Sequence, residues 1–114
     1  MEQRIKAVIY ARVSSEEQKK EGFSIPAQLD LLHDFARKNN IEIVKEFEEA
    51  ETAKQAGRHK FNEMLKFLKK NKDVTNILCE KTDRLYRNFK DYVDLDVDTT
   101  GYTVYLVKES VVLS

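Results

Sequence analysis

Hydrophobic residues change their spacing several times along the chain, and each spacing predicts a different element. The segment 6–13 contains the apolar run Ala7–Tyr10 and lacks Gly and Pro, which predicts a buried strand. Over 41–47 apolar and charged residues alternate, as in a strand with one exposed face. Further apolar segments predict two more strands and a short edge strand, at 74–79, 102–107 and 111–113.

Helical spacing occupies the intervals between the first three strands. Ser24 is placed to cap a helix with Pro26 in its first turn, and this helix is predicted to end near Asn39. A second amphipathic helix is predicted from Phe61 to Leu68, before a lysine-rich segment that suits a helix C-terminus. The remaining intervals predict polar loops over 14–22 and 48–57 and a weaker helix around 89–97.

Strands that alternate with helices through short connections predict right-handed crossovers. The expected fold class is therefore α/β, with a mainly parallel sheet of four to five strands and helices on both faces. A chain of 114 residues can bury one hydrophobic core and is too short for two, so residues 1–114 are expected to form a single domain.

Composition narrows the choice of partners. Twenty Lys and Arg balance twenty Asp and Glu, so the chain lacks the cationic excess that drives non-specific DNA binding. A DNA-binding function would need a local patch or protein outside this chain. The one cysteine, Cys79, lies in an apolar run and is interpreted as a buried strand residue. No apolar run approaches the roughly 20 residues that span a bilayer, so no membrane contact and a cytoplasmic location are expected.

Polar side chains suited to phosphate chemistry follow three of the predicted strands. They are Arg12 and Ser14 after the first strand, Arg58 after the second, and Asp83, Arg84 and Arg87 after the third. The carboxyl ends of parallel strands share one edge of a sheet, so these residues can converge there. A hydroxyl among guanidiniums suits a phosphoryl transition state, because planar N–H forks bind several phosphate oxygens. Nearby positive charge also favours the alkoxide of Ser14, the candidate nucleophile.

The same residues are compatible with a purely structural role. A serine at a strand end is often a turn or helix-cap residue, and Asp83 with Arg84 could form a surface ion pair at a helix start. The sequence lacks a GxxxxGK[ST] loop, a GxGxxG, an HExxH and paired Cys/His ligands, so no other catalytic motif competes. The acidic residues Glu48, Glu49 and Glu51 are interpreted as a solvated charge run rather than a metal site.

Four segments resemble, in order, motifs of the serine site-specific recombinases of the resolvase and invertase class. Residues 10–15 (YARVSS) resemble the nucleophile motif. Residues 22–28 (GFSIPAQ) resemble the start of the first helix in large serine integrases and transposon recombinases. Residues 57–65, beginning GRHKF, resemble the second motif, and 81–88 (KTDRLYRN) resemble the third. The resemblance covers essentially the whole chain and implies the resolvase catalytic-domain fold.

The resemblance also implies an activity and partners. The implied activity is the cleavage and rejoining of DNA in site-specific recombination, through a covalent link between a serine and the 5′ phosphate. It needs neither metal nor cofactor, because the phosphoserine link preserves the energy of the broken bond for religation. The implied partners are double-stranded DNA and further copies of the protein, which assemble as dimers and tetramers on two DNA sites and exchange half-sites by subunit rotation.

Carried over by position, the resemblance gives roles to individual residues. Ser14 would be the nucleophile that attacks the DNA phosphodiester and releases a 3′ hydroxyl. The scissile phosphate would be held by Arg12, Arg58, Arg84 and Arg87. Asp83 would position the arginines or assist proton transfer. Supporting roles would fall to Ser15, Gln18 and Gln28.

The sequence departs from the family pattern in the second loop and at its end. That loop usually carries Gly or Ser near its start and Pro after the arginine, whereas this chain has residues 51–53 (ETA) and His59. The chain ends at Ser114, where the family continues into a dimerisation helix and DNA-binding domains. Residues 1–114 are therefore expected to be an isolated catalytic domain, monomeric by itself and unable to recombine DNA alone.

Two other functions are compatible with this fold. The first is a non-catalytic regulatory relative, which the intact serine and arginine set argues against. The second is a flavodoxin-like or receiver-like phosphate-binding module. Such a module would need an acidic pocket or a Gly-rich loop after the first strand, where this chain has residues 12–15 (RVSS) instead.

Overall fold

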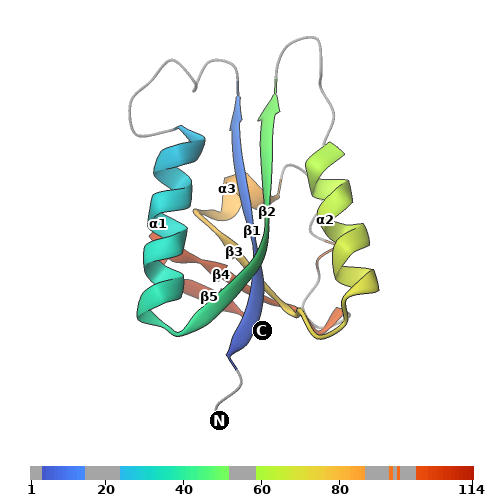
Figure 1. Ribbon diagram of the computed structural model, residues 1–114. Helices are drawn as coiled ribbons and strands as arrows, with labels where there is room; N and C mark the ends of the chain where they lie inside the picture. The colour runs from blue at the N-terminus through green and yellow to red at the C-terminus, as the bar shows by residue number, and fades with distance from the viewer. Residues whose placement is uncertain (1–3, 15–23, 52–58, 87–92, 94, 96–99) are drawn as a thin grey trace.

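The sheet is built around its first strand, which has neighbours on both edges. The computed structural model describes residues 4–14, 24–51, 59–86, 93, 95 and 100–114 (Figure 1). The strands are β1 (Ile5–Ser14), β2 (Ile41–Glu51), β3 (Asn76–Cys79), β4 (Thr103–Leu106) and β5 (Val111–Leu113). Their order is β2-β1-β3-β4-β5, and all neighbours pair in parallel except β4 and β5, which are antiparallel.

Helices cover both faces of this sheet, which confirms the predicted α/β class. The helical elements are α1 (Ile25–Lys38), α2 (His59–Lys70), the short α3 (Thr82–Leu85) and the 3-10 turn η2 (Val107–Glu109). In Figure 1, α1 and α2 stand on opposite sides of the long strands β1 and β2, while α3 lies behind β1. Within the described ranges, no helix combines the length and apolar character needed to cross a membrane.

The predicted boundaries of the first helix are confirmed. The Ser24 hydroxyl accepts a hydrogen bond from the Ala27 N–H at 3.2 Å, and Pro26 lies in the first turn. The helix ends at Lys38, and Asn40 takes a left-handed conformation with φ of 55°, which Asn tolerates better than most residues. Apart from residues 93 and 95, the predicted helix around 89–97 lies outside the described residues, as do most of the two predicted polar loops.

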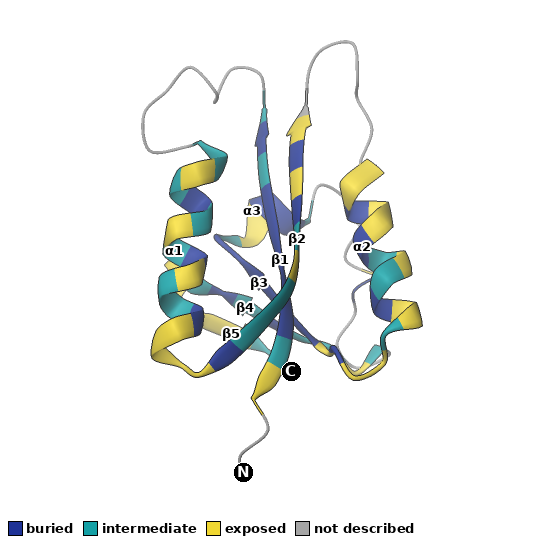
Figure 2. Ribbon diagram, viewed as in Figure 1, coloured by how far each residue is buried: buried dark blue, intermediate teal, exposed yellow. Residues whose placement is uncertain are grey.

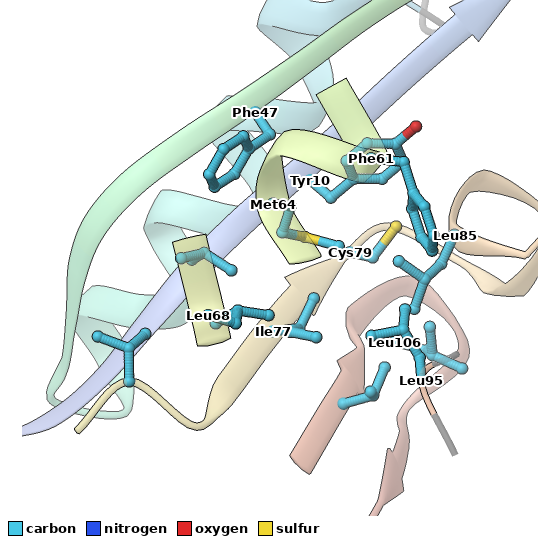
Figure 3. Packing of buried hydrophobic residues seen from close by; sticks show 13 residues of the cluster. Tyr10, Phe47, Phe61, Met64, Leu68, Ile77, Cys79, Leu85, Leu95 and Leu106 are labelled. Atoms are coloured by element: carbon cyan, nitrogen blue, oxygen red, sulfur yellow. The ribbon is translucent and has the colours of Figure 1, made fainter. Parts of the chain in front are cut away.

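Two buried clusters lie on the two faces of the sheet. On the α1 face, Leu32 and Ala36 pack against Ala7 and Ile9 of β1. The α2 face carries the larger cluster, shown in Figure 3, where Phe61 and Met64 lie near Tyr10. Figure 2 shows the corresponding buried stripe on each helix and its exposed outer surface. Cys79 belongs to the larger cluster, as predicted, and burial raises the pKa of its thiol to about 12.

Part-way along β2, the alternation of its side chains between the two faces of the sheet is interrupted. Its register against β1 slips by one residue, because Ala7 pairs with Ile43 whereas Val8 pairs with Lys45. Ile43 therefore packs on the α1 side, but Phe47 packs on the α2 side, although the two differ by an even number of positions. Strand β2 also extends to Glu51, so the predicted loop over 48–57 was wrong in its first four residues.

Leu68→Ala is expected to destabilise the domain by about 2–5 kcal/mol, because it leaves a cavity under α2. Leu68 is 1% exposed in the larger cluster. Urea unfolding followed by circular dichroism measures the change. Lys66→Ala, at an exposed position of the same helix, is the control and is expected to stay within about 0.5 kcal/mol of the parent chain. Equal stabilities of the two variants would contradict this account of the core.

Candidate active site

Ser14 and Arg12 lie on a part of β1 that extends beyond β3. Pairing between β1 and β3 ends at Tyr10 and Cys79, whereas pairing between β1 and β2 continues to Ser14. Alternate residues of a strand share a face, so Arg12 and Ser14 leave the strand on the same side as Tyr10. Tyr10 packs in the cluster under α2, which places both candidate catalytic side chains on the α2 and α3 face.

Gln28 replaces the missing strand partner of Arg12. Its side-chain oxygen accepts the Arg12 N–H at 3.1 Å, and its side-chain N–H donates to the Arg12 carbonyl at 3.0 Å. One amide side chain from α1 thus pairs with one residue of β1 as a neighbouring strand would. Gln28 is fully buried, so the cost of leaving these backbone groups without partners is avoided. The expectation that Gln28 supports the first motif agrees with this geometry.

The Arg12 guanidinium is bound to the backbone of α3. Its Nε donates to the Arg84 carbonyl at 3.0 Å, and its Nη2 donates to the Asp83 carbonyl. Two carbonyls at neighbouring positions fix the plane of a guanidinium, because the two N–H groups are part of one rigid fork. The first and third motifs of the sequence therefore meet at this arginine, as the parallel sheet predicted.

Arg84 itself is buried and paired within the protein. Its side chain is 2% exposed, and its Nε donates to the Glu80 carboxylate at 3.2 Å. Glu80 is similarly buried, at 4% exposed. Removing one partner of such a pair leaves an uncompensated charge in the interior, so Glu80 and Arg84 depend on each other. Glu80 was not singled out in the sequence, although its spacing of four residues from Arg84 is compatible with such a pair.

The Asp83 side chain is largely exposed to solvent. Its carboxylate is 73% exposed and lies 3.9 Å from the Lys81 ammonium group. The contact of Asp83 with Arg12 is made by its backbone carbonyl. The positioning that was expected from the carboxylate is thus provided by the main chain in this structure.

Glu49 is buried, so its interpretation as part of a solvated charge run was wrong. It is 5% exposed, and its Oε1 accepts the Tyr10 hydroxyl at 2.9 Å and the Phe61 N–H at 3.2 Å. Its Oε2 accepts the Lys60 N–H at 3.2 Å. Glu49 therefore caps the N-terminus of α2, where unpaired N–H groups and the helix dipole favour an anion. This helix begins at His59, the residue after Arg58.

A signal for Glu49 was present in the sequence but weak. Glu49 lies two positions after the apolar Phe47, so it shares a face with a core residue if the strand continues. Four further candidate residues lie outside the described part of the chain: Ser15, Gln18, Arg58 and Arg87. The described residues thus bring together Arg12, Gln28 and the backbone of α3, with Ser14 at the end of the same strand.

Comparison with known families agrees with this geometry. Residues 7–113 match the family model described as Resolvase, N terminal domain. The chain belongs to this family of serine recombinase catalytic domains. The match spans all of the described strands except the first two residues of β1, and it assigns the chain to DNA recombination at the level of the family.

Solved structures of recombinase domains resemble the chain over nearly its whole length. The N-terminal catalytic domain of TP901-1 integrase has a TM-score of 0.75 at 27% identity, covering 94% of this chain and 80% of that one. A resolvase family site-specific recombinase from Streptococcus pneumoniae has a TM-score of 0.76 at 31% identity, with 96% and 76% covered. The C-terminal catalytic domain of ISC1926 TnpA, an IS607-like serine recombinase, has a TM-score of 0.71 at 28% identity, with 90% and 67% covered. No curated protein matches the sequence significantly.

Glu49→Gln is expected to destabilise the domain by about 1–3 kcal/mol despite its similar shape. The glutamine would keep one oxygen, but its N–H donors would face the Lys60 N–H, because Glu49 accepts on both oxygens. Urea unfolding and amide exchange at Lys60 and Phe61 measure the loss. Glu48→Gln, at the exposed neighbouring position, serves as the control. Unchanged exchange at both amides would rule out this cap.

Proposed function

We propose that the chain is the catalytic domain of an enzyme that cleaves and rejoins DNA in site-specific recombination through a phosphoserine link to Ser14. The observation that carries the proposal is the placement of Ser14 two residues beyond Arg12, on the same face of β1, where α3 fixes the Arg12 guanidinium. A nucleophile beside an oriented guanidinium suits attack on a phosphodiester.

The chemical step forms one phosphorus–oxygen bond and breaks another. The Ser14 Oγ attacks the phosphorus atom and loses its proton, while the bond to the 3′ oxygen breaks and that oxygen gains a proton. The number of phosphoester bonds does not change, so the reverse attack by a 3′ hydroxyl can reseal the strand without ATP. Asp83 is the proposed aid to proton transfer, and its exposed carboxylate is compatible with that role.

The arginines are proposed to divide the stabilisation of the transition state among them. Arg12 would present a guanidinium of fixed plane to the phosphate, because the two α3 carbonyls hold it. Arg84 is buried and its charge is compensated by Glu80, so its proposed role as a phosphate ligand rests on the family resemblance. Arg58 and Arg87 are proposed as further phosphate ligands, and Ser15 and Gln18 as supporting residues, on the family resemblance alone.

The DNA partner and the assembly are part of the same proposal. The chain carries no net charge, so binding to DNA would depend on protein outside residues 1–114 and on self-association into dimers and tetramers. Residues 1–114 would then act as a catalytic domain that does not recombine DNA by itself, and the natural location would be the cytoplasm, on DNA. Strand exchange on a plasmid by this chain alone would overturn this part.

Ser14→Ala is expected to abolish the covalent protein–DNA adduct on nicked suicide substrates, tested in the full-length protein with its own recombination site. The alanine removes the only atom proposed to bond phosphorus. Ser15→Ala is the matched control and should only weaken adduct formation. Failure of the parent protein to form an adduct while it binds the site would sink the catalytic proposal and favour a non-catalytic regulatory relative.

Arg12→Lys is expected to slow adduct formation by about 10²- to 10³-fold, as loss of an aligned transition-state donor does. An ammonium group cannot reproduce the fork that spans the carbonyls of Asp83 and Arg84. Single-turnover rates at saturating protein measure the effect. Arg37→Lys, at an exposed position of α1 paired with Asp34, is the control and should react like the parent. A rate for Arg12→Lys within a factor of two of the parent rate would disprove the role.

A further inference from the structure

We propose that Glu109 is a positioning residue for the active site: from the connection between β4 and β5 it caps α3, and α3 in turn fixes Arg12. This inference rests on the catalytic function proposed above. It adds a residue that lies far from the nucleophile in sequence and belongs to none of the four motifs. Three links connect the turn that carries Glu109 to the α3 segment, and α3 to Arg12.

The first link joins η2 to the start of α3. The Glu109 Oε1 accepts the Thr82 N–H at 2.7 Å and the Thr82 hydroxyl at 2.6 Å. Thr82 is the first residue of α3, and the preceding Lys81 makes no side-chain capping bond. A carboxylate at a helix start satisfies an N–H that has no partner inside the helix, so Glu109 acts as the cap that Lys81 does not provide.

A second link ties the same two segments through the backbone. The Lys108 N–H donates to the Glu80 carbonyl at 2.9 Å. Glu80 also holds the buried Arg84 guanidinium through its side chain. The segment 107–109 therefore contacts the chain on both sides of Lys81, with a backbone bond to Glu80 before it and a side-chain bond to Thr82, the first residue of α3, after it.

The third link is the pair of α3 carbonyls that bind Arg12. Asp83 and Arg84 are the second and third residues of this four-residue helix, so their carbonyls move with its first turn. So short a helix has little stability by itself and depends on contacts from outside. Removing the Glu109 cap should therefore let the first turn of α3 shift and tilt the Arg12 guanidinium.

The charge on Glu109 strengthens the first link. The two hydrogen bonds from Thr82 lower the pKa of the Glu109 carboxyl, and the nearby Lys81 acts in the same direction. The carboxylate is therefore ionised at neutral pH, and its bonds to Thr82 are charge-assisted. Glu109 is exposed, so substituting it should leave the hydrophobic core intact.

The first experiment observes Arg12 directly, without DNA, by nuclear magnetic resonance on the chain. Glu109→Ala is expected to speed amide exchange at Thr82 about five- to tenfold, as loss of an N-cap does, and to shift the Arg12 Nε–H signal. Glu109→Gln should give a smaller shift, because it keeps a neutral acceptor. Lys108→Gln, the exposed neighbour, should leave both signals unchanged. An unchanged Arg12 Nε–H signal in Glu109→Ala would overturn the inference.

The second experiment measures catalysis in the full-length protein. Glu109→Ala is expected to lower the single-turnover rate of Ser14 adduct formation about ten- to a hundredfold, with DNA affinity unchanged. Adding Thr82→Val to it should cause little further loss, because both changes break the same link. A parent-like rate in Glu109→Ala would refute the positioning role. If the parent protein forms no adduct, the proposed function fails, but the resonance experiment still decides whether Glu109 positions Arg12.

Discussion

The backbone of Arg12 needs a hydrogen-bonding partner where the neighbouring strand β3 has already ended, and the side chain of Gln28 supplies it. Without that amide, the strand that carries the candidate nucleophile would leave a partly buried N–H and carbonyl without these partners, at a cost of up to about 1–3 kcal/mol each. The bond also fixes β1 against α1 at the point where the side chain of Arg12 reaches across to α3. Gln28 thus ties this end of β1 to α1, and the Arg12 side chain ties it to α3.

Around that point, both arginines are bound by groups of the protein before any DNA is present. Arg84 is buried against Glu80, and Arg12 binds neutral carbonyls whose dipoles point toward it. Burying a guanidinium is tolerated only with such partners. The arrangement gives the two arginines fixed orientations at the cost of a weaker field at the surface. Such a site relies on the fixed orientation of its guanidinium groups more than on long-range electrostatic attraction. The zero net charge of the chain agrees with this.

The sequence was sufficient to predict the fold class, the helix at Ser24 and the meeting of the first and third motifs. These follow from periodicity, capping residues and the rule that parallel strands end at one edge. Glu49 was missed because a loop was predicted from residue 48, whereas β2 continues to Glu51. The register slip near Val44, which places Phe47 on the α2 face, has no sequence signature either. The roles of the Asp83 carbonyl and of Glu109 were missed because main-chain contacts and caps from distant segments leave no local pattern. Spacing places residues at an edge, but it does not say which atoms meet.

The position of β1 between β2 and β3 has a consequence for how the chain folds. Its residue Ala7 pairs with Ile43 on one side and with Asn76 on the other, so the first strand to be synthesised waits for the third before both of its edges are paired. Contacts so distant in sequence slow folding, because the entropy of closing a long loop is lost before the burial of apolar surface compensates for it. Until β3 emerges, the apolar segment from Ala7 to Val13 lacks one of its two neighbours. This segment is therefore the part of the nascent chain most prone to aggregation, and α1, which follows it directly, is the first element able to shield it.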